Sequence, residues 1–207
     1  MMEYFTIFRI FLETKTFFMK RLTVAMLPVL LSCSLLSTYA QSNDDMKAMM
    51  DYATPGEVHK MMAKSAGDWT CAITLWMAPG AKPETATSES KMEMILGGRY
   101  LQQKNTGNFM GMPFEGIGVT GYDNAKKIFV STWMDNMGTG IMYLTGNWDA
   151  ASNTLVLTGS MVDPASGKDI AVKETVQNVD DNHQLMNMFV TAGGQEFKSM
   201  EIKMTRK

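Results

Sequence analysis

The sequence is poor in the residues from which metal clusters, disulfide networks and basic nucleic-acid surfaces are built. Its 207 residues include only two cysteines and two histidines, too few for a zinc cluster or a disulfide framework. The net charge is −2, so the chain offers no strongly basic surface for nucleic acid. The scarcity of His and Cys also argues against catalysis that needs several of them. The rest is a globular composition, 45% hydrophobic and long enough for one buried core.

The first 40 residues have the layout of a secretory signal peptide. Lys20 and Arg21 form a positive segment, residues 22–36 are almost wholly apolar, and small residues lead to a cleavage site after Ala40. The apolar run is too short for a stable membrane span, and polar residues follow it directly. We therefore expect a periplasmic or secreted protein with no integral membrane segment in the mature chain.

The start of translation and the fate of Cys33 are linked to this interpretation. The signal layout begins at Met19, so we expect Met19 to be the true start. An alternative is a lipoprotein, because residues 30–33 read Leu-Leu-Ser-Cys and Cys33 would then carry the lipid. Cleavage after Ala40 leaves Cys71 as the single cysteine, which excludes an intrachain disulfide.

A short helical region is expected before the main domain. Residues 41–53 form an N-terminal segment, part of which can be helical. Thr54, Pro55 and Glu57 then match a capping box, with Thr54 as the N-cap. Gly67 is placed to end the helix. The apolar stripe of this helix consists of Val58, Met61 and Met62.

From residue 68 onward the hydrophobic period is two, as in half-buried β-strands. Turn signals separate ten segments and no crossover helix joins them, which predicts an all-β, antiparallel up-and-down barrel. Closure of the barrel removes the exposed sheet edges. We expect one domain over residues 54–207. The predicted strands cover residues 69–77, 88–96, 99–104, 114–122, 128–135, 140–148, 154–162, 170–179, 185–191 and 197–204.

Methionine is the one compositional anomaly, with 22 residues. Pairs such as Met92/Met94 and Met186/Met188 place two thioethers on one face of a strand. Three interpretations are open: methionine replaces leucine as an adaptable core residue, lines a pocket for an apolar ligand, or binds a soft metal such as Cu(I). The first interpretation carries the most weight, and we expect no metal site and no cofactor.

Other motifs favour structural interpretations. Gly116, Gly118 and Gly121 spell a dinucleotide pattern, but the segment is itself a predicted strand with no helix after it, so the glycines serve bending or internal space. His59 and His183 are single histidines that we expect to be solvated rather than metal-bound.

Polar residues near the predicted strand ends give no catalytic constellation. Ser131, Thr132 and Asp135 have no histidine near them in sequence, which argues against a catalytic triad. Glu89 and Glu93 lie on the polar face of their predicted strand and are expected at the surface.

Two sets of residues carry a resemblance to known families. Gly67-Asp68-Trp69 opens the first predicted strand and Arg206 closes the last, which resembles the calycin signature of a tryptophan packed under an arginine. Several segments from about residue 55 to 207 also resemble the bacterial family called domain of unknown function 1579 (DUF1579). They are Leu96-Gly97-Gly98-Arg99-Tyr100-Leu101, Pro113-Phe114-Glu115-Gly116, Gly121-Tyr122-Asp123-Asn124, Trp133-Met134-Asp135 and Met204-Thr205-Arg206. The resemblance implies a lipocalin-like barrel with structural roles for Gly67, Trp69 and Arg206. It implies no activity or catalytic residues.

The leading functional hypothesis is an exported barrel that binds a small apolar or amphipathic molecule without catalysing a reaction. Trp133 and Asp135, at the end of a strand, are the best candidates for ligand contacts, with Tyr122 and Phe114. The alternative is a structural or interaction module of the cell envelope whose barrel is filled by its own side chains. An enzyme is the least supported class.

Overall fold

The computed structural model describes residues 43–109 and 111–207. The predicted signal peptide therefore lies outside the described residues. The chain divides into two compact units with a boundary between Asp51 and Tyr52. Residues 43–53 are helical, and among the described helices none is long and apolar enough to cross a membrane.

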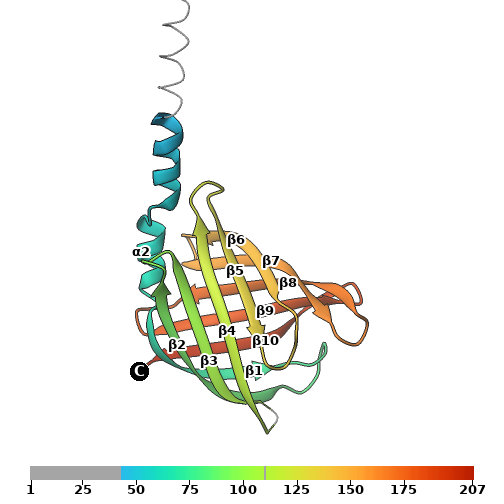
Figure 1. Cartoon of the computed structure of the whole chain (residues 1–207). Helices are drawn as coiled ribbons and strands as arrows, with labels where there is room; N and C mark the ends of the chain where they lie inside the picture. Colours follow the sequence, from blue (N-terminus) through green and yellow to red (C-terminus); the bar gives the residue numbers. More distant parts are fainter. Residues whose placement is uncertain (1–42, 110) are drawn as a thin grey trace, which may run out of the picture. The chain divides into compact units, whose positions relative to one another are not determined.

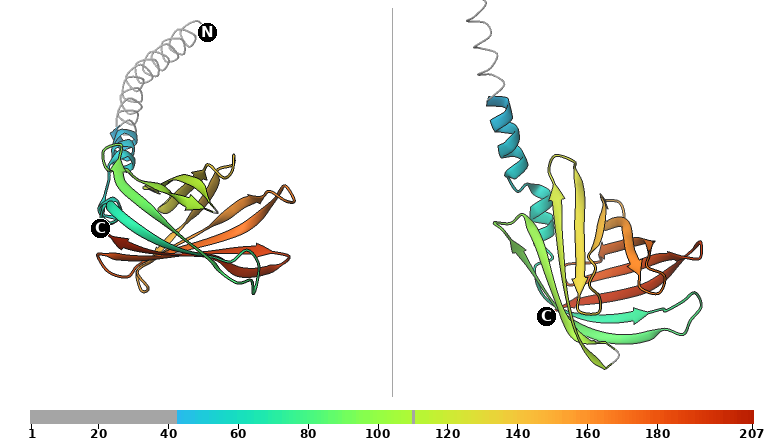
Figure 2. Two further views of the ribbon diagram at one scale, coloured as in Figure 1. Left: turned by 90° about the horizontal axis from the view of Figure 1, so that it is seen from below. Right: turned by 45° about the vertical axis from the view of Figure 1, so that its right-hand side comes forward.

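The main unit is a closed antiparallel barrel of ten strands in meander order, which confirms the predicted fold class (Figure 1). Each strand pairs with its neighbours in sequence, and β1 pairs with β10 to close the ring (Figure 2). One short helix, α2 (Glu57–Ala63), precedes them. The strands are β1 (Gly67–Leu75), β2 (Glu84–Ile95), β3 (Tyr100–Phe109), β4 (Met112–Asp123), β5 (Ile128–Asp135), β6 (Met142–Asp149), β7 (Thr154–Asp163), β8 (Lys168–Asn178), β9 (His183–Ala192) and β10 (Gln195–Arg206).

All ten predicted strands are present, with corrected ends. The spacing predicts Met77 and Leu96 within strands, but both residues lie outside them and are 67% and 69% exposed. Leu96 has a positive φ of 49° and begins the β2–β3 turn, where Gly97 and Gly98 follow with positive φ. The turn therefore begins one residue before the glycines that mark it in the sequence.

Aspartates at strand ends organise three of the hairpin turns. Asp123 accepts hydrogen bonds from the backbone N–H groups of Ala125 and Lys126, both at 2.9 Å. Asp149 and Asp163 each accept one hydrogen bond from the backbone N–H two residues later and one from the serine hydroxyl three residues later. These hydrogen bonds lower the pKa of all three carboxyls. The chain thus reverses where a short polar side chain can replace a backbone partner.

The helix α2 begins two residues later than predicted. Its N-cap is Gly56 rather than Thr54, and the Gly56 N–H donates to Nδ1 of His59 at 3.0 Å. His59 is 5% exposed, so its predicted solvent exposure is wrong. It packs edge-on against Tyr122 of β4, with ring centroids 6.1 Å apart. Burial lowers the pKa of His59, which keeps Nδ1 free to accept the capping bond.

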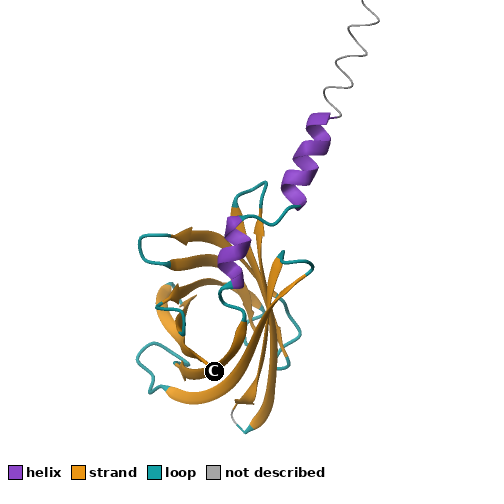
Figure 3. Ribbon diagram, turned by 90° about the vertical axis from the view of Figure 1, so that its left-hand side faces the viewer, coloured by secondary structure: helices purple, strands orange, loops and turns teal. Residues whose placement is uncertain are grey.

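The helix packs at one end of the barrel, where Figure 3 shows it at the rim of the ring of strands. Met62 belongs to the buried core together with Phe129, Leu144 and Leu157 of the strands. The helix itself ends at Ala63, so Gly67 does not end it as expected but begins β1. The Asn124 side chain donates to the carbonyls of Tyr52 and Thr54 and so holds the segment before the helix.

The predicted tryptophan–arginine contact is present at the same end. The guanidinium carbon of Arg206 lies 4.2 Å from the ring centroid of Trp69, which is 1% exposed. The guanidinium donates to the carbonyls of Ala66 and Lys64, both at 2.7 Å, and to that of Asp181 at 2.9 Å. Arg206 therefore joins the end of β10, the α2–β1 connection and the β8–β9 turn.

Candidate functional site

The interior of the barrel holds a cavity of about 510 Å³. This volume lies within the range of about 300–1,000 Å³ that is usual for small-molecule sites. Strand alternation builds the lining, because every second residue of each strand points inward. Met61 and Met62 of α2 also line the cavity, as does Ser65 in the turn that follows this helix.

Methionine is the most frequent residue type in the lining. Ten methionines line the cavity, which places most thioethers of the strands inside the barrel. Of the predicted pairs, Met186 and Met188 both line it, as does Met92, and Met94 packs against the buried core. Met134 faces outward and is 37% exposed. The lining methionines are Met61, Met62, Met92, Met137, Met142, Met161, Met186, Met188, Met200 and Met204.

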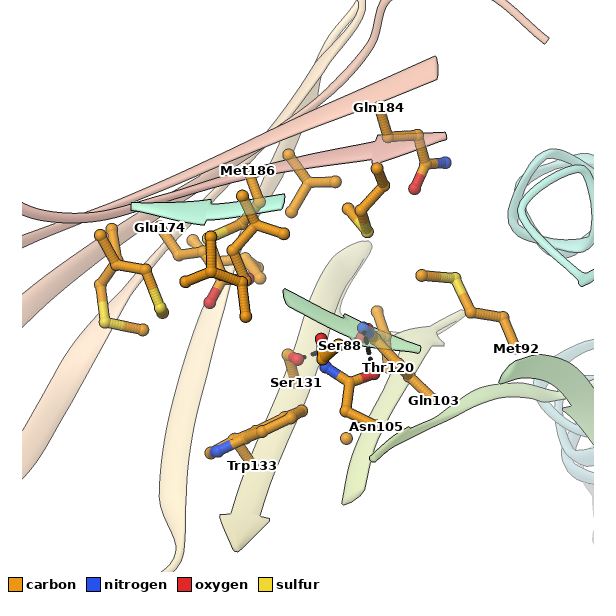
Figure 4. Close-up of a pocket in the computed structure, with 18 of the residues that line it drawn as sticks. Ser88, Met92, Gln103, Asn105, Thr120, Ser131, Trp133, Glu174, Gln184 and Met186 are labelled. Carbon is orange, nitrogen blue, oxygen red and sulfur yellow. Dashed lines mark hydrogen bonds between the residues drawn. The ribbon is translucent and has the colours of Figure 1, made fainter. Parts of the chain in front are cut away.

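One wall of the cavity is polar and lies on β2 to β5. Gln103 donates to Oδ1 of Asn105 at 3.0 Å, and the hydroxyls of Thr120 and Ser131 are 3.1 Å apart (Figure 4). Ser88 Oγ is buried in the same wall and has no oxygen or nitrogen partner among the described residues. We name these five residues the polar wall. Their inward amides and hydroxyls can hydrogen-bond a neutral polar group of a ligand.

The opposite wall, on β6 to β9, is mostly apolar, and two of its polar residues, Asn178 and Gln184, are hydrogen-bonded to each other at 2.9 Å. Leu144, Leu157 and Met186 are among its lining residues. The charged residue of this wall is Glu174 on the inward face of β8, whose carboxyl is directed toward the cavity in Figure 4. Burial raises the pKa of Glu174 to about 7. A carboxyl that ionises near neutral pH thus lies between the apolar side chains of Leu157 and Met188.

Three of the four predicted ligand-contact residues line the cavity: Phe114, Trp133 and Asp135. The Trp133 indole N–H donates to Oδ2 of Asp135 at 2.8 Å, and Oδ1 accepts from the Met137 backbone at 3.0 Å. Tyr122 is absent from the lining. It instead packs between His59 and Phe129 beneath α2.

The glycines of the dinucleotide-like pattern create space for Trp133. A Cβ on Gly116 would lie 2.4 Å from the indole, and one on Gly118 would lie 3.2 Å from it. The strand register pairs Gly118 directly with Trp133. The two glycines therefore form a slot in β4 that holds the indole, and the segment is a strand, as its flanking sequence predicted.

The remaining candidates do not converge. Ser131 and Thr132 lie on β5 and line the cavity, but no histidine lines it with them. His183 is at the surface, with Nδ1 2.9 Å from Asp180. Glu89 and Glu93 are exposed on the outer face of β2, as expected. Within residues 43–109 and 111–207, no three His, Cys, Asp or Glu residues are grouped to hold a metal ion.

Sequence reasoning missed Glu174, Gln103 and Asn105. In β8, apolar residues at 170, 172 and 176 define the inward face, and Glu174 occupies a position of that face. In β3, the same alternation places Gln103 and Asn105 in line with Leu101. The period of two therefore contained the signal, but their polarity suggested the surface.

The closed antiparallel barrel, the internal cavity and the tryptophan–arginine contact define a calycin-like protein. The chain belongs to the family described as "Protein of unknown function (DUF1579)", whose model matches residues 54–206. The sequence matches none of the curated proteins with which it was compared.

Two solved structures share the fold. Rv2717c from M. tuberculosis is similar with a TM-score of 0.55 and 14% identity, over 74% of this chain and 99% of that one. The S-type phycobiliprotein lyase CPES from Guillardia theta has a TM-score of 0.50 and 11% identity, over 77% of this chain and 96% of that one. At such identities the likeness concerns the architecture alone.

Proposed function

We propose that this protein binds a small apolar or amphipathic molecule inside its barrel and catalyses no reaction. The observation that carries the proposal is the cavity of about 510 Å³ with its methionine-rich lining. Thioether side chains are unbranched and polarisable, so they adapt to ligands of different shape. The similarity to a phycobiliprotein lyase supports a barrel of this kind as a scaffold for a site.

The test is binding of an uncharged fluorophore, Nile red, to the purified protein. We expect saturable binding with a blue shift of its emission, because the interior is apolar. Ala86 lines the cavity, and Thr85 beside it is exposed on the outer face of β2. Ala86→Phe should weaken binding at least tenfold by filling the cavity, whereas Thr85→Phe should bind like the wild type. Absence of binding, or equal binding by both variants, would contradict the proposal.

We propose further that the protein is exported, with cleavage after Ala40. The support is the sequence of residues 20–40, with its positive, apolar and small-residue segments in order. Intact-mass measurement of the protein from its own host tests this directly. A mass equal to that of residues 41–207 agrees with the proposal. A lipid-modified chain that begins at Cys33 would contradict cleavage after Ala40 and support the lipoprotein alternative. An uncleaved chain would contradict both.

The same preparation can be used to identify a ligand that the protein carries from its own host. Native mass spectrometry without detergent should show an added mass that solvent extraction removes. The class of molecule recovered would then identify what the cavity holds in the cell.

A further inference from the structure

Glu174 lies on the apolar wall with apolar residues on both sides. The strand register places Leu157 of β7 and Met188 of β9 directly opposite it. Its own strand places Val172 and Val176 at the neighbouring inward positions. A glutamate in such surroundings loses hydration, and nothing in the barrel wall replaces it.

The Glu174 carboxyl has no hydrogen-bond or ion-pair partner among the residues that the structure describes. Asp135 differs in this respect, because the Trp133 indole and the Met137 backbone N–H already occupy its two oxygens. Of the two acidic residues in the lining, Glu174 is thus the one whose two carboxyl oxygens are both without a partner among the described residues.

The ionisable groups of the cavity have one sign of charge. Glu174 and Asp135 line it, and no Lys, Arg or His is part of the lining. A ligand carboxylate or phosphate would find no cation inside and would be repelled. A ligand cation would be attracted, and the low dielectric of the interior strengthens that attraction.

We propose that the cavity selects an amphipathic amine, whose protonated nitrogen pairs with the Glu174 carboxylate while its apolar body lies against the lining methionines. This inference rests on the proposed function and names the class of ligand. An ammonium–carboxylate hydrogen bond gives Glu174 the partner that it lacks. The same bond fixes the orientation of the ligand within the apolar site.

The pH dependence follows from the groups around Glu174. Residues at the nearest inward positions of β7, β8 and β9 do not titrate, and Lys173 on the outer face is paired with Glu196. Asp135 is the other titratable residue of the lining. Protonation of Glu174 below its pKa of about 7 should therefore remove the attraction for an amine. The apolar residues at those positions are Leu155, Leu157, Gly159, Val172, Val176, Met186, Met188 and Val190.

The experiment measures displacement of Nile red by decylamine, decanol and decanoate, which share one alkyl chain. At about pH 8.5 decylamine should bind roughly tenfold to a hundredfold more tightly than decanol, and decanoate more weakly than either. Between about pH 8.5 and pH 5.5 the affinity for decylamine should fall by at most about thirtyfold, while that for decanol stays constant.

Variants identify the residue responsible. Glu174→Gln keeps the shape of the side chain and should remove both the preference for decylamine and its pH dependence, with decanol binding retained. Glu93→Gln, at an exposed position of β2, is the matched control and should behave as the wild type. Nile red binding by each variant shows that its barrel is folded and open.

The outcomes separate the two proposals. If neither Nile red nor any decyl compound binds, the proposed ligand-binding function fails. If all three compounds compete equally, or decanoate competes best, the function stands and selection of an amine is overturned. A decylamine preference that persists in Glu174→Gln also overturns it.

Discussion

Replacement of Arg206 by alanine should loosen the end of the barrel at which α2 packs. Its guanidinium donates to three carbonyls and covers Trp69 at 4.2 Å. The bond to Ala66 is partly buried and contributes about 1 kcal/mol, and the two exposed bonds contribute a few tenths each because water can replace them. The stacking on Trp69 adds about 1 kcal/mol. We therefore expect a loss of about 2–3 kcal/mol in the free energy of unfolding.

Urea denaturation followed by tryptophan fluorescence measures this loss. For a domain of this size it corresponds to a fall in Tm of about 5–10 °C. Arg99→Ala is the matched control, since Arg99 is exposed and donates a single bond to Leu96. A loss for Arg206→Ala within about 0.5 kcal/mol of that for Arg99→Ala would refute the reasoning.

Gly67 provides an independent check on the same contact. A Cβ at this position would lie 2.5 Å from Nη1 of Arg206, and the φ of 138° disfavours a side chain. Gly67→Ala should destabilise the protein by displacing the guanidinium as well as by backbone strain. In the Arg206→Ala background the cost should be smaller, because the displaced group is gone. Fully additive losses would show that the two residues act separately.

Three further predictions concern ionisation and the indole slot. Glu174→Gln should stabilise the protein by as much as about 3 kcal/mol near pH 8 and have little effect near pH 4, because ionisation of the buried carboxyl costs stability as the pH rises from 4.5 through about 7. An equal effect at both pH values would contradict this. His59 should act in the opposite direction: its lowered pKa means that stability is lost as the pH falls below 6.5, and hydrogen exchange of α2 should quicken there, an effect absent in His59→Gln. Gly118→Val should force the Trp133 indole out of its slot and alter its emission and the affinity for Nile red, whereas Gly138→Val, in open space, should leave both unchanged.

The fold was predictable because its main determinants are local. Alternation and turn residues repeat along the chain, and a meander needs only neighbouring strands to pair. The contact between Trp69 and Arg206 was also predicted, although the two residues are far apart in sequence, because the family resemblance joins them. The prediction that Met77 and Leu96 lie within strands is wrong because a period of two does not indicate where a strand ends.

The site was harder to predict because it depends on which surface each strand presents. His59 has charged neighbours in sequence, yet the helix turns it toward Tyr122 and away from solvent. Glutamate is a residue type that usually lies at the surface, but the alternation of β8 places Glu174 on the inward face. Tyr122 shares a face with the lining residues of β4, but α2 covers its end of the strand. Such facts follow from closure of the ring and from docking of the helix, and no single strand contains them.

The methionine lining also makes the interior sensitive to oxidants. Oxidation of a thioether to the sulfoxide turns a flexible apolar side chain into a polar one and adds a strong acceptor. Ten such side chains line the cavity, so even partial oxidation would make the interior more polar. Under the proposed function, the chemistry that lets this interior adapt to different shapes would also make its affinity for a ligand depend on the redox conditions around the protein, and methionine sulfoxide reduction would restore that affinity.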